Sequence, residues 1–264
     1  MSLNNYKKEW ALVTGASSGI GLEFCRQLAA AGVNLVMVAR REELLQTLAE
    51  DLSRQHQIET RVIAEDLSQP EGSALVHART KASNITIKLL VNNAGIGRWG
   101  TFESSSAGKY QEMIALNNTA VVTLCHLFLP DLSSFIQSAI INVSSPAAFQ
   151  PVPYMAVYAA TKSFLQSFSQ ALHGELADRG VYVQTLIPGP TETEFDEKAG
   201  AYESALKGRD APGKVVGASL ANLGSSKPVV VTAEGTYKQR FFAGLFPAKI
   251  VIKEVGKMFT PPGK

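Results

Sequence analysis

Tyr158 and Lys162 lie four residues apart in the helix-compatible run Tyr158-Ala-Ala-Thr-Lys162. On a helix, positions i and i+4 share one face, with Cβ atoms roughly 5–6 Å apart, so both polar groups can enter one pocket. An ammonium group beside a phenol favours the phenolate and lowers the phenol pKa from roughly 10. The pair therefore predicts a general acid/base at Tyr158. A bare Tyr-x-x-x-Lys is more often an ordinary helix turn, so this interpretation depends on the rest of the chain.

A second chemical signal is the glycine-rich segment Thr14-Gly-Ala-Ser-Ser-Gly-Ile-Gly21, which follows an apolar stretch and precedes a helical pattern. In a strand–turn–helix unit of this kind, backbone N–H groups at the start of the helix face an anion such as a pyrophosphate. Gly15 would permit the tight turn and Gly19 the close approach of a phosphate. Alone, the motif fits a plain turn equally well.

The end of the next apolar stretch, Ala39-Arg40-Arg41, bears on the choice of dinucleotide. Folds that bind NAD usually place an acidic residue here, on the adenosine ribose hydroxyls. Ala39 takes that position, and a guanidinium group suits the acceptor oxygens of a 2′-phosphate. We therefore predict NADP as the cofactor, with Arg40 on the 2′-phosphate. The alternative, that the arginines open the next helix in solvent, fits Arg41 better than Arg40.

Apolar and amphipathic segments alternate along the chain and predict the elements that position these residues. The pattern indicates an α/β fold: a doubly wound parallel sheet of Rossmann type, with about seven strands, helices on both faces and a single domain over residues 1–264. In such a sheet, ligands bind at the carboxyl ends of the strands. The expected strands span residues 10–14, 34–39, 59–64, 88–91, 139–143, 181–187 and 227–232, and the expected helices 22–31, 41–56, 70–83, 109–129, 158–178 and 212–223.

Several polar or small residues follow the expected strands and should therefore meet at one edge of the sheet. Asp66 could accept a bond from an adenine amino group, or it could cap a helix. The small pair Ala94-Gly95 would let the backbone approach a cofactor. Ser144 and Ser145 follow the fifth strand, where a hydroxyl is a good donor to a developing oxyanion.

Two segments depart from the alternating pattern. Residues 190–214 contain few large apolar side chains and are predicted to form a lid over the strand ends. Residues 237–264 form a C-terminal extension that is apolar with interspersed lysines. We expect this extension to pack on the core or on a partner chain, with membrane contact as the less favoured alternative.

Net charge, the spacing of histidines and cysteines, and the length of apolar runs each argue against a class of protein. The formal net charge of +2 is too balanced to indicate nucleic acid binding, and His56, His77 and His173 lack metal-ligand spacing. Cys25 and Cys125 are isolated thiols in apolar patterns, which indicates a reducing compartment and a cytoplasmic protein. The first ten residues and the rest of the chain show no apolar run of the roughly 18 residues that a spanning helix needs.

Together, these pieces resemble the short-chain dehydrogenase/reductase family, over nearly the whole chain up to about the last thirty residues. In that family the catalytic serine lies thirteen residues before the tyrosine, which selects Ser145 over Ser144. The resemblance implies a catalytic set of Asn117, Ser145, Tyr158 and Lys162. It implies cofactor contacts from Gly15, Ser17, Ser18, Gly19, Ile20, Arg40, Asp66, Leu67, Asn93, Ala94, Gly95, Tyr158, Lys162, Pro188, Gly189, Thr191 and Thr193.

The resemblance also implies a mechanism in which NADPH delivers hydride to a ketone or aldehyde and Tyr158 donates the proton. Ser145 would hold the carbonyl oxygen. Lys162 would lower the Tyr158 pKa and bind the nicotinamide ribose, and Asn117 would hold a water that links Lys162 to solvent. Asn93 would hold the adenosine side and Thr193 the nicotinamide carboxamide.

The substrate is expected to be a mostly apolar carbonyl compound or alcohol, and the protein a homodimer or homotetramer, because the helices around Asn117 and Tyr158 carry apolar residues on more than one face. A different class of function, a non-catalytic NADP-binding sensor or scaffold, would not need the intact catalytic set. The apolar pocket is predicted from Trp99, Ala147, Phe149, Pro151, Val152, Tyr154, Met155, Phe195 and Tyr202.

Overall fold

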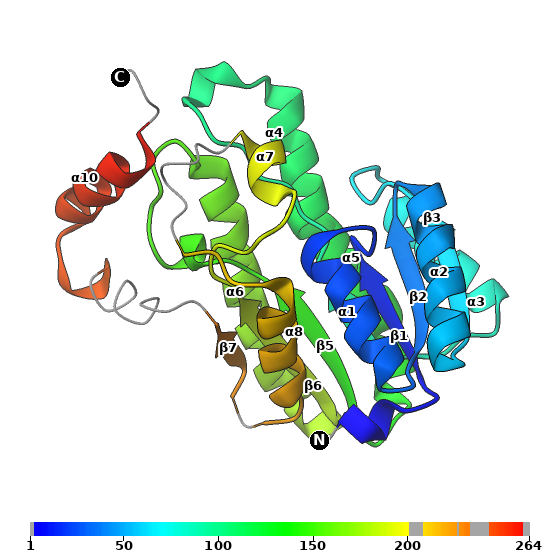
Figure 1. The fold of residues 1–264 in the computed structure, drawn as a ribbon. Helices are drawn as coiled ribbons and strands as arrows, with labels where there is room; N and C mark the ends of the chain where they lie inside the picture. The colour runs from blue at the N-terminus through cyan, green and yellow to red at the C-terminus, as the bar shows by residue number, and fades with distance from the viewer. Residues whose placement is uncertain (1–2, 201–207, 226, 233–242, 261–264) are drawn as a thin grey trace.

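The computed structural model describes residues 3–200, 208–225, 227–232 and 243–260. A sheet of seven parallel strands in the order β3-β2-β1-β4-β5-β6-β7 runs through its centre (Figure 1). The predicted α/β fold is thereby confirmed. The strands are β1 Trp10–Thr14, β2 Asn34–Ala39, β3 Thr60–Ala64, β4 Ile87–Asn92, β5 Ser138–Val143, β6 Val181–Ile187 and β7 Val229–Val231.

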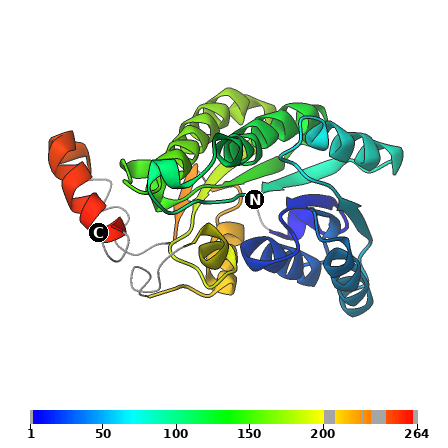
Figure 2. The same cartoon turned by 90° about the horizontal axis from the view of Figure 1, so that it is seen from above.

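Helices cover both faces of the sheet, as the view from above shows (Figure 2). Successive strand residues point to opposite faces, so in β1 Ala11 and Val13 join one buried cluster and Leu12 the other. The first cluster lies under α1 (Gly19–Ala30), α2 (Glu42–His56) and α8 (Pro212–Ala221). The second lies under α3 (Gly72–Ala82), α5 (Ala120–Ser133) and α6 (Ala156–Leu176).

The remaining elements lie at the carboxyl ends of the strands or join the layers. A third apolar cluster there includes Trp99, Val152 and Met155 together with Val251 and Val255 of the C-terminal helix. These elements are α4 Ala107–Ile114, α7 Phe195–Ala199, α10 Ala248–Phe259, the 3-10 turns Leu3–Tyr6, Phe102–Ser104, Pro146–Phe149 and Ala177–Arg179, and a π-helical turn Ala115–Thr119.

The single helix predicted over residues 109–129 is wrong in its continuity and in its end. The structure divides it into α4, the π-helical turn and α5, and α5 continues through Pro130 to Ser133. Pro130 lacks a backbone N–H, so the helix loses one hydrogen bond there. The next residue, Asp131, stabilises the last turn of α5 through its side chain. The Asp131 carboxylate accepts bonds from Ile87 N (3.1 Å) and Lys81 Nζ (2.8 Å).

The helical run Ala107–Ser133 is long and apolar enough to cross a membrane by composition. Half of its most apolar stretch is buried within the protein. Leu124, Phe128 and Leu132 belong to the cluster beneath the sheet. The α5 part of the run therefore packs in the core of this domain.

Candidate functional site

A cleft of about 540 Å³ lies at the carboxyl ends of the strands, across the position where the strand order reverses between β1 and β4. This is where doubly wound sheets bind ligands, and the volume lies within the usual range for ligand sites. Every residue predicted to contact the cofactor lines this cleft, and so does Ser145. Asn117 is not among the residues that line the cleft.

The glycine-rich turn forms the floor of the cleft and is tied to the end of β4. Thr14 Oγ1 accepts bonds from the backbone N–H groups of Asn93 (2.9 Å) and Ala94 (3.0 Å), and Asn93 Nδ2 donates to Thr14 O (2.9 Å). Gly15 has a φ of +66°, and a Cβ there would lie 2.8 Å from Asn93 Nδ2. The turn is thus fixed with its backbone close to the neighbouring strand, and it fits the pyrophosphate of a dinucleotide beside the start of α1.

The end of β2 places Arg40 beside two carboxylates. Its Nη1 lies 3.9 Å from Asp66 Oδ2 and 3.8 Å from Glu112 Oε1, and its side chain is 60% exposed. Asp66 Oδ1 accepts bonds from Ser68 N (3.0 Å) and Ser68 Oγ (2.7 Å), the geometry of a local turn. Burial acts to raise the pKa of Asp66, but the Ser68 bonds and the Arg40 charge together hold this pKa below its usual value.

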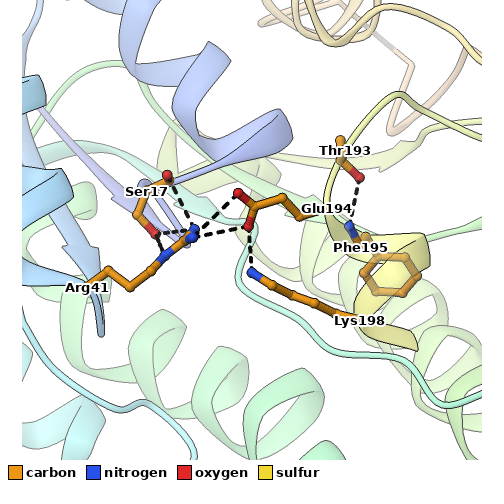
Figure 3. Close-up of polar contacts among 6 residues, drawn as sticks. All are labelled: Ser17, Arg41, Thr193, Glu194, Phe195 and Lys198. Carbon is orange, nitrogen blue, oxygen red and sulfur yellow. Dashed lines mark hydrogen bonds and ion pairs between the residues drawn. The ribbon is translucent and has the colours of Figure 1, made fainter. Parts of the chain in front are cut away.

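Arg41 precedes the first residue of α2, as the alternative interpretation of the sequence expected, but its partly exposed side chain is bound to other residues of the cleft and does not simply lie in solvent. Its Nε and Nη2 donate to Ser17 Oγ (3.2 and 3.0 Å), and its Nη1 donates to Glu194 Oε2 (3.1 Å), as Figure 3 shows. Arg41 and Glu194 are 153 residues apart in the sequence. No local pattern marks such a contact, and sequence reasoning missed both residues as parts of the site.

Tyr158 and Lys162 lie one turn apart on α6 and are both buried, 8% and 5% exposed. Lys162 Nζ donates to Val143 O (2.9 Å) and lies 5.8 Å from the centre of the Tyr158 ring. Ser144 Oγ donates to Lys162 O (3.0 Å) and so supports the helix. Ser145 hydrogen-bonds the Tyr158 side chain. The structure therefore brings Ser145, and not Ser144, to the phenol.

The pKa values of this pair differ from the prediction. Burial raises the pKa of Tyr158 to about 12, and the charge of Asp196 also acts to raise it, although the Ser145 bond acts to lower it. Burial lowers the pKa of Lys162 to about 8. The expected lowering of the Tyr158 pKa by Lys162 is wrong for this structure, because the cost of burying a phenolate dominates and the ammonium group is bound to Val143 O.

Asn117 lies in the π-helical turn, a distortion that often occurs at functional sites. Its Oδ1 accepts from Ile96 N (3.0 Å), and its Nδ2 donates to Ile96 O (3.0 Å) and Thr161 Oγ1 (3.0 Å). A Cβ on Gly95 would lie 3.2 Å from Asn117 Oδ1 and 3.5 Å from Lys162 Nζ. Because glycine has no side chain, Gly95 leaves room for the Asn117 amide and the Lys162 ammonium group to lie close to each other.

Residues 190–199, which we call the strap, cross the cleft from β6. Thr193 Oγ1 accepts a bond from Phe195 N (3.2 Å; Figure 3), and Trp99 N donates to Ala199 O (2.9 Å). The Phe195 ring centre lies 5.5 Å from that of Tyr158. The strap is therefore the described part of the predicted lid nearest to the phenol. Residues 201–207 of the predicted lid, with Tyr202, lie outside the described residues.

The far end of the cleft is apolar. Trp99, Ala147, Val152, Met155 and Phe195 line it as predicted, whereas Phe149, Pro151 and Tyr154 do not. Met258 and Phe259 of α10 also line it, and sequence reasoning missed both. Trp99 Nε1 donates to Phe259 O (2.9 Å), and the two rings lie 5.0 Å apart. The C-terminal helix thereby becomes a wall of the cleft.

Comparison with known proteins extends these observations. Residues 9–204 match a family model described as short chain dehydrogenase. A very-long-chain 3-oxoacyl-CoA reductase from Meyerozyma guilliermondii is 35% identical over 190 residues, 69% of this chain and 56% of that protein. Inactive hydroxysteroid dehydrogenase-like protein 1 from Homo sapiens is 34% identical over 181 residues, 68% of this chain and 54% of that protein. The chain thus spans about half the length of these relatives.

A solved structure of a short-chain dehydrogenase is also similar to this chain. A short-chain dehydrogenase from Sphingobium yanoikuyae in complex with NADPH is 31% identical to this chain, with a TM-score of 0.81 over 89% of this chain and 93% of that one. The family match extends over most of the chain and includes every residue of the predicted catalytic set. The chain belongs to the short-chain dehydrogenase/reductase family.

Proposed function

We propose that this protein is an NADP(H)-dependent oxidoreductase that interconverts a ketone or aldehyde and an alcohol on a mostly apolar substrate. One observation carries the proposal: Ser145, Tyr158 and Lys162 line the same cleft as the glycine-rich turn, with Tyr158 and Lys162 buried one turn apart on α6 and the half-buried Ser145 beside the phenol. A protein that only bound a dinucleotide would not need two hydroxyls and an ammonium group at the apolar end of the cleft.

Tyr158 is suited to the role of proton donor. With a pKa of about 12, the phenol keeps its proton at neutral pH and can give it to a carbonyl oxygen as negative charge develops there. Ser145 lies beside the phenol and can donate a second hydrogen bond to that oxygen. When bound, the reduced nicotinamide supplies the hydride.

Lys162 then stabilises the phenolate that remains after proton transfer. Its ammonium group is buried and near the ring, so its charge acts with little screening by water. The lowered pKa of about 8 means that Lys162 is mostly protonated at neutral pH yet able to release a proton. We propose that Asn117 serves the return of that proton by holding a water, as sequence reasoning indicated.

The choice of NADP rests on two guanidinium groups at the end of β2. Arg40 and Arg41 both line the cleft, and no acidic residue occupies position 39. A 2′-phosphate would meet both positive charges, which are otherwise balanced by Asp66, Glu112 and Glu194. The NADPH bound to the Sphingobium yanoikuyae protein favours the same choice.

The apolar lining from Trp99, Val152, Met155, Met258 and Phe259 supports a bulky or long-chain carbonyl substrate. The name of the relative from Meyerozyma guilliermondii is consistent with a long acyl chain.

We further propose that the protein is a homodimer or homotetramer that uses the face formed by α4, α5 and α6. A shallow apolar hollow there is lined by residues of these helices, and Ile114 and Phe164 are about half exposed within it. The free, buried thiols Cys25 and Cys125 are consistent with the proposed cytoplasmic location.

The test is NADPH oxidation by the purified full chain against 3-oxoacyl thioesters, steroid ketones, aryl ketones and small diketones. We expect turnover of at least one bulky apolar ketone, and slower turnover with NADH than with NADPH. NADPH binding without turnover of any of these compounds would favour the alternative of a sensor or scaffold. That alternative has a precedent in the name of the inactive human relative.

A further inference from the structure

Exposed apolar side chains are concentrated near the C-terminus of the described chain. Among the residues that the structure describes, eleven large apolar side chains are exposed, and five of them lie between Leu245 and Met258. Leu245 and Met258 are each 62% exposed. Scattered exposed apolar residues need no explanation, whereas a local cluster marks a surface that contacts something else. The five are Leu245, Phe246, Ile250, Ile252 and Met258, and we call them the tail patch.

The tail patch lies beside three lysines of α10, of which Lys257 is paired with the exposed Glu254 (2.7 Å). Lys249, Lys253 and Lys257 are spaced four residues apart, so they share one face of α10, and all three are exposed. Ile250 belongs to the same face, three residues before Lys253. By sequence, residues 237–264 carry six basic residues and one acidic residue, a net charge of +5. Because the whole chain is only +2, the preceding 236 residues carry a net charge of −3.

The position of α10 is fixed by its opposite face. Val251 and Val255 are buried against the cluster that contains Trp99 and Met155, and Phe259 O accepts the Trp99 indole bond. In both overall views α10 lies at one edge of the protein (Figures 1 and 2). Met258 lines the cleft and is also 62% exposed. The tail patch thus reaches the apolar end of the cleft.

We propose that the tail patch binds the surface of an anionic lipid bilayer and places the apolar end of the cleft against it. Apolar side chains flanked by lysines on a helix at the protein edge are the composition of an interfacial helix: the apolar groups enter the headgroup region and the lysines meet lipid phosphates. An apolar substrate dissolved in the bilayer would then reach the cleft beside Met258. The expectation that this extension packs on the core is confirmed for α10 by its buried face, and the proposed membrane contact concerns its exposed face.

Charge favours a bilayer over a second copy of the chain. A two-fold contact through this surface would bring the lysines of one copy close to those of the other, and like charges at such an interface oppose association. Anionic lipid phosphates instead complement them. Self-association through this surface is therefore the competing outcome that the experiment must detect.

The experiment is co-sedimentation of the full chain with vesicles of phosphatidylcholine and phosphatidylglycerol in about equal amounts, and with vesicles of phosphatidylcholine alone, without cofactor or substrate. We expect binding to the anionic vesicles that weakens steeply with salt. The Lys249→Gln/Lys253→Gln/Lys257→Gln variant should lower the partition coefficient about 100-fold. Leu245→Ser/Ile250→Ser should lower it about 10-fold or more, because these side chains are exposed in the free protein and buried in the bilayer.

Two matched controls make the same chemical changes elsewhere. Ile136→Ser removes an apolar side chain that is 96% exposed, in the turn before β5, and Lys8→Gln/Lys109→Gln/Lys227→Gln removes three exposed lysines. Both should bind vesicles like the wild type. Absence of binding to anionic vesicles, or equal loss in variants and controls, would overturn the proposal. The proposal would also be overturned if the tail variants changed mass by light scattering but bound vesicles like the wild type. That result would show that the tail patch contacts a second copy of the chain.

Vesicle binding does not require turnover. A protein that binds vesicles but reduces no ketone would therefore refute the proposed enzyme activity and leave the membrane surface standing. A protein that reduces ketones but does not bind anionic vesicles would support the enzyme activity and refute the membrane surface.

Discussion

The two sides of the cleft are held in different ways. On the α6 side, Asn117 and Lys162 are buried and each bonds to backbone groups of neighbouring elements. On the strap side, Glu194 is about half exposed and is held by the charges of Arg41 and Lys198 (Figure 3). Buried hydrogen bonds open only with a large part of the fold, whereas exposed ion pairs open locally. The proposed chemistry thus lies on the rigid side, and the predicted lid lies on the weaker one.

The two sides also differ in electrostatics. On the α6 side, burial dominates and moves the pKa of Tyr158 up and that of Lys162 down. On the strap side, the hydrogen bond from Lys198 outweighs the effect of burial and, with the Arg41 charge, lowers the pKa of Glu194. Changes on the α6 side should therefore have large effects on turnover and stability, and changes on the strap should have small effects on cofactor exchange.

The largest expected effect comes from Tyr158→Phe, which removes the proposed proton donor and keeps the ring. We expect kcat to fall about 10³-fold, because general acid catalysis contributes between about 10² and 10⁴. The Kd for NADPH, measured by fluorescence titration, should change by less than about 2-fold. Tyr110→Phe makes the same change at a partly buried phenol outside the cleft lining, whose hydroxyl donates to Phe102 O, and should leave kcat unchanged. Normal turnover in Tyr158→Phe would exclude the phenol as the acid.

The second effect tests the burial of Lys162 through the pH dependence of stability. Burial lowers its pKa from 10.5 to about 8. Between these values the unfolded chain holds more protons than the folded one, so the contribution of Lys162 to stability rises as pH rises. Compared with Lys162→Met by urea unfolding, the wild type should gain about 2 kcal/mol between about pH 7 and about pH 10. A constant difference between the two proteins would show that the ammonium group is solvated.

The same contrast explains what the sequence could predict. On the α6 side, the contacts that matter are short in sequence or follow from topology: Lys162 is one turn from Tyr158, and parallel strands bring Ser145 to the same edge of the sheet. The apolar pattern of the sequence predicted all seven strands, and each predicted strand end lies within two residues of the observed end. The pKa of Tyr158 was predicted in the wrong direction, because spacing does not report how deeply a group is buried or that Val143 O binds Lys162.

On the strap side, local patterns carried little information. The Arg41–Glu194 contact joins two loops through exposed charges, and either residue alone looks like an ordinary surface residue. The cleft residues Met258 and Phe259 come from a helix that packs near Trp99 some 160 residues away in sequence. Such contacts depend on how loops return over the sheet, which periodicity does not determine.

The third prediction compares the two arginines at the end of β2. Arg40→Ala should raise the Kd for NADPH about 10- to 100-fold, because it removes charge-assisted bonds to a 2′-phosphate. The Kd for NADH should change by less than about 2-fold. Arg41→Ala should have the same direction and a smaller effect, because binding the phosphate must compete with the existing bond to Glu194. Equal losses for both cofactors would show that neither arginine contacts the 2′-phosphate.

The smallest effect should come from Glu194→Gln, which removes the charge that joins the strap to Arg41 and Lys198. An exposed ion pair contributes about 0–1 kcal/mol, so the dissociation rate of NADPH, measured by stopped-flow displacement, should change less than about 5-fold. We expect entry to accelerate more than release, because the pair spans the cleft in the protein alone and its loss also frees Arg41 for the 2′-phosphate. The difference between variant and wild type should disappear at high salt, which screens exposed charges.

The matched control for the strap is Asp51→Asn, which removes the acidic partner of Arg54 from an exposed pair on α2, away from the cleft. It makes the same change in charge and should leave both rates of cofactor exchange unaltered. If Glu194→Gln instead slowed release or lowered kcat as strongly as Tyr158→Phe, the strap would be part of the rigid catalytic wall. The contrast between the two sides of the cleft would then be wrong, because exposed charges alone cannot stabilise a transition state to that extent.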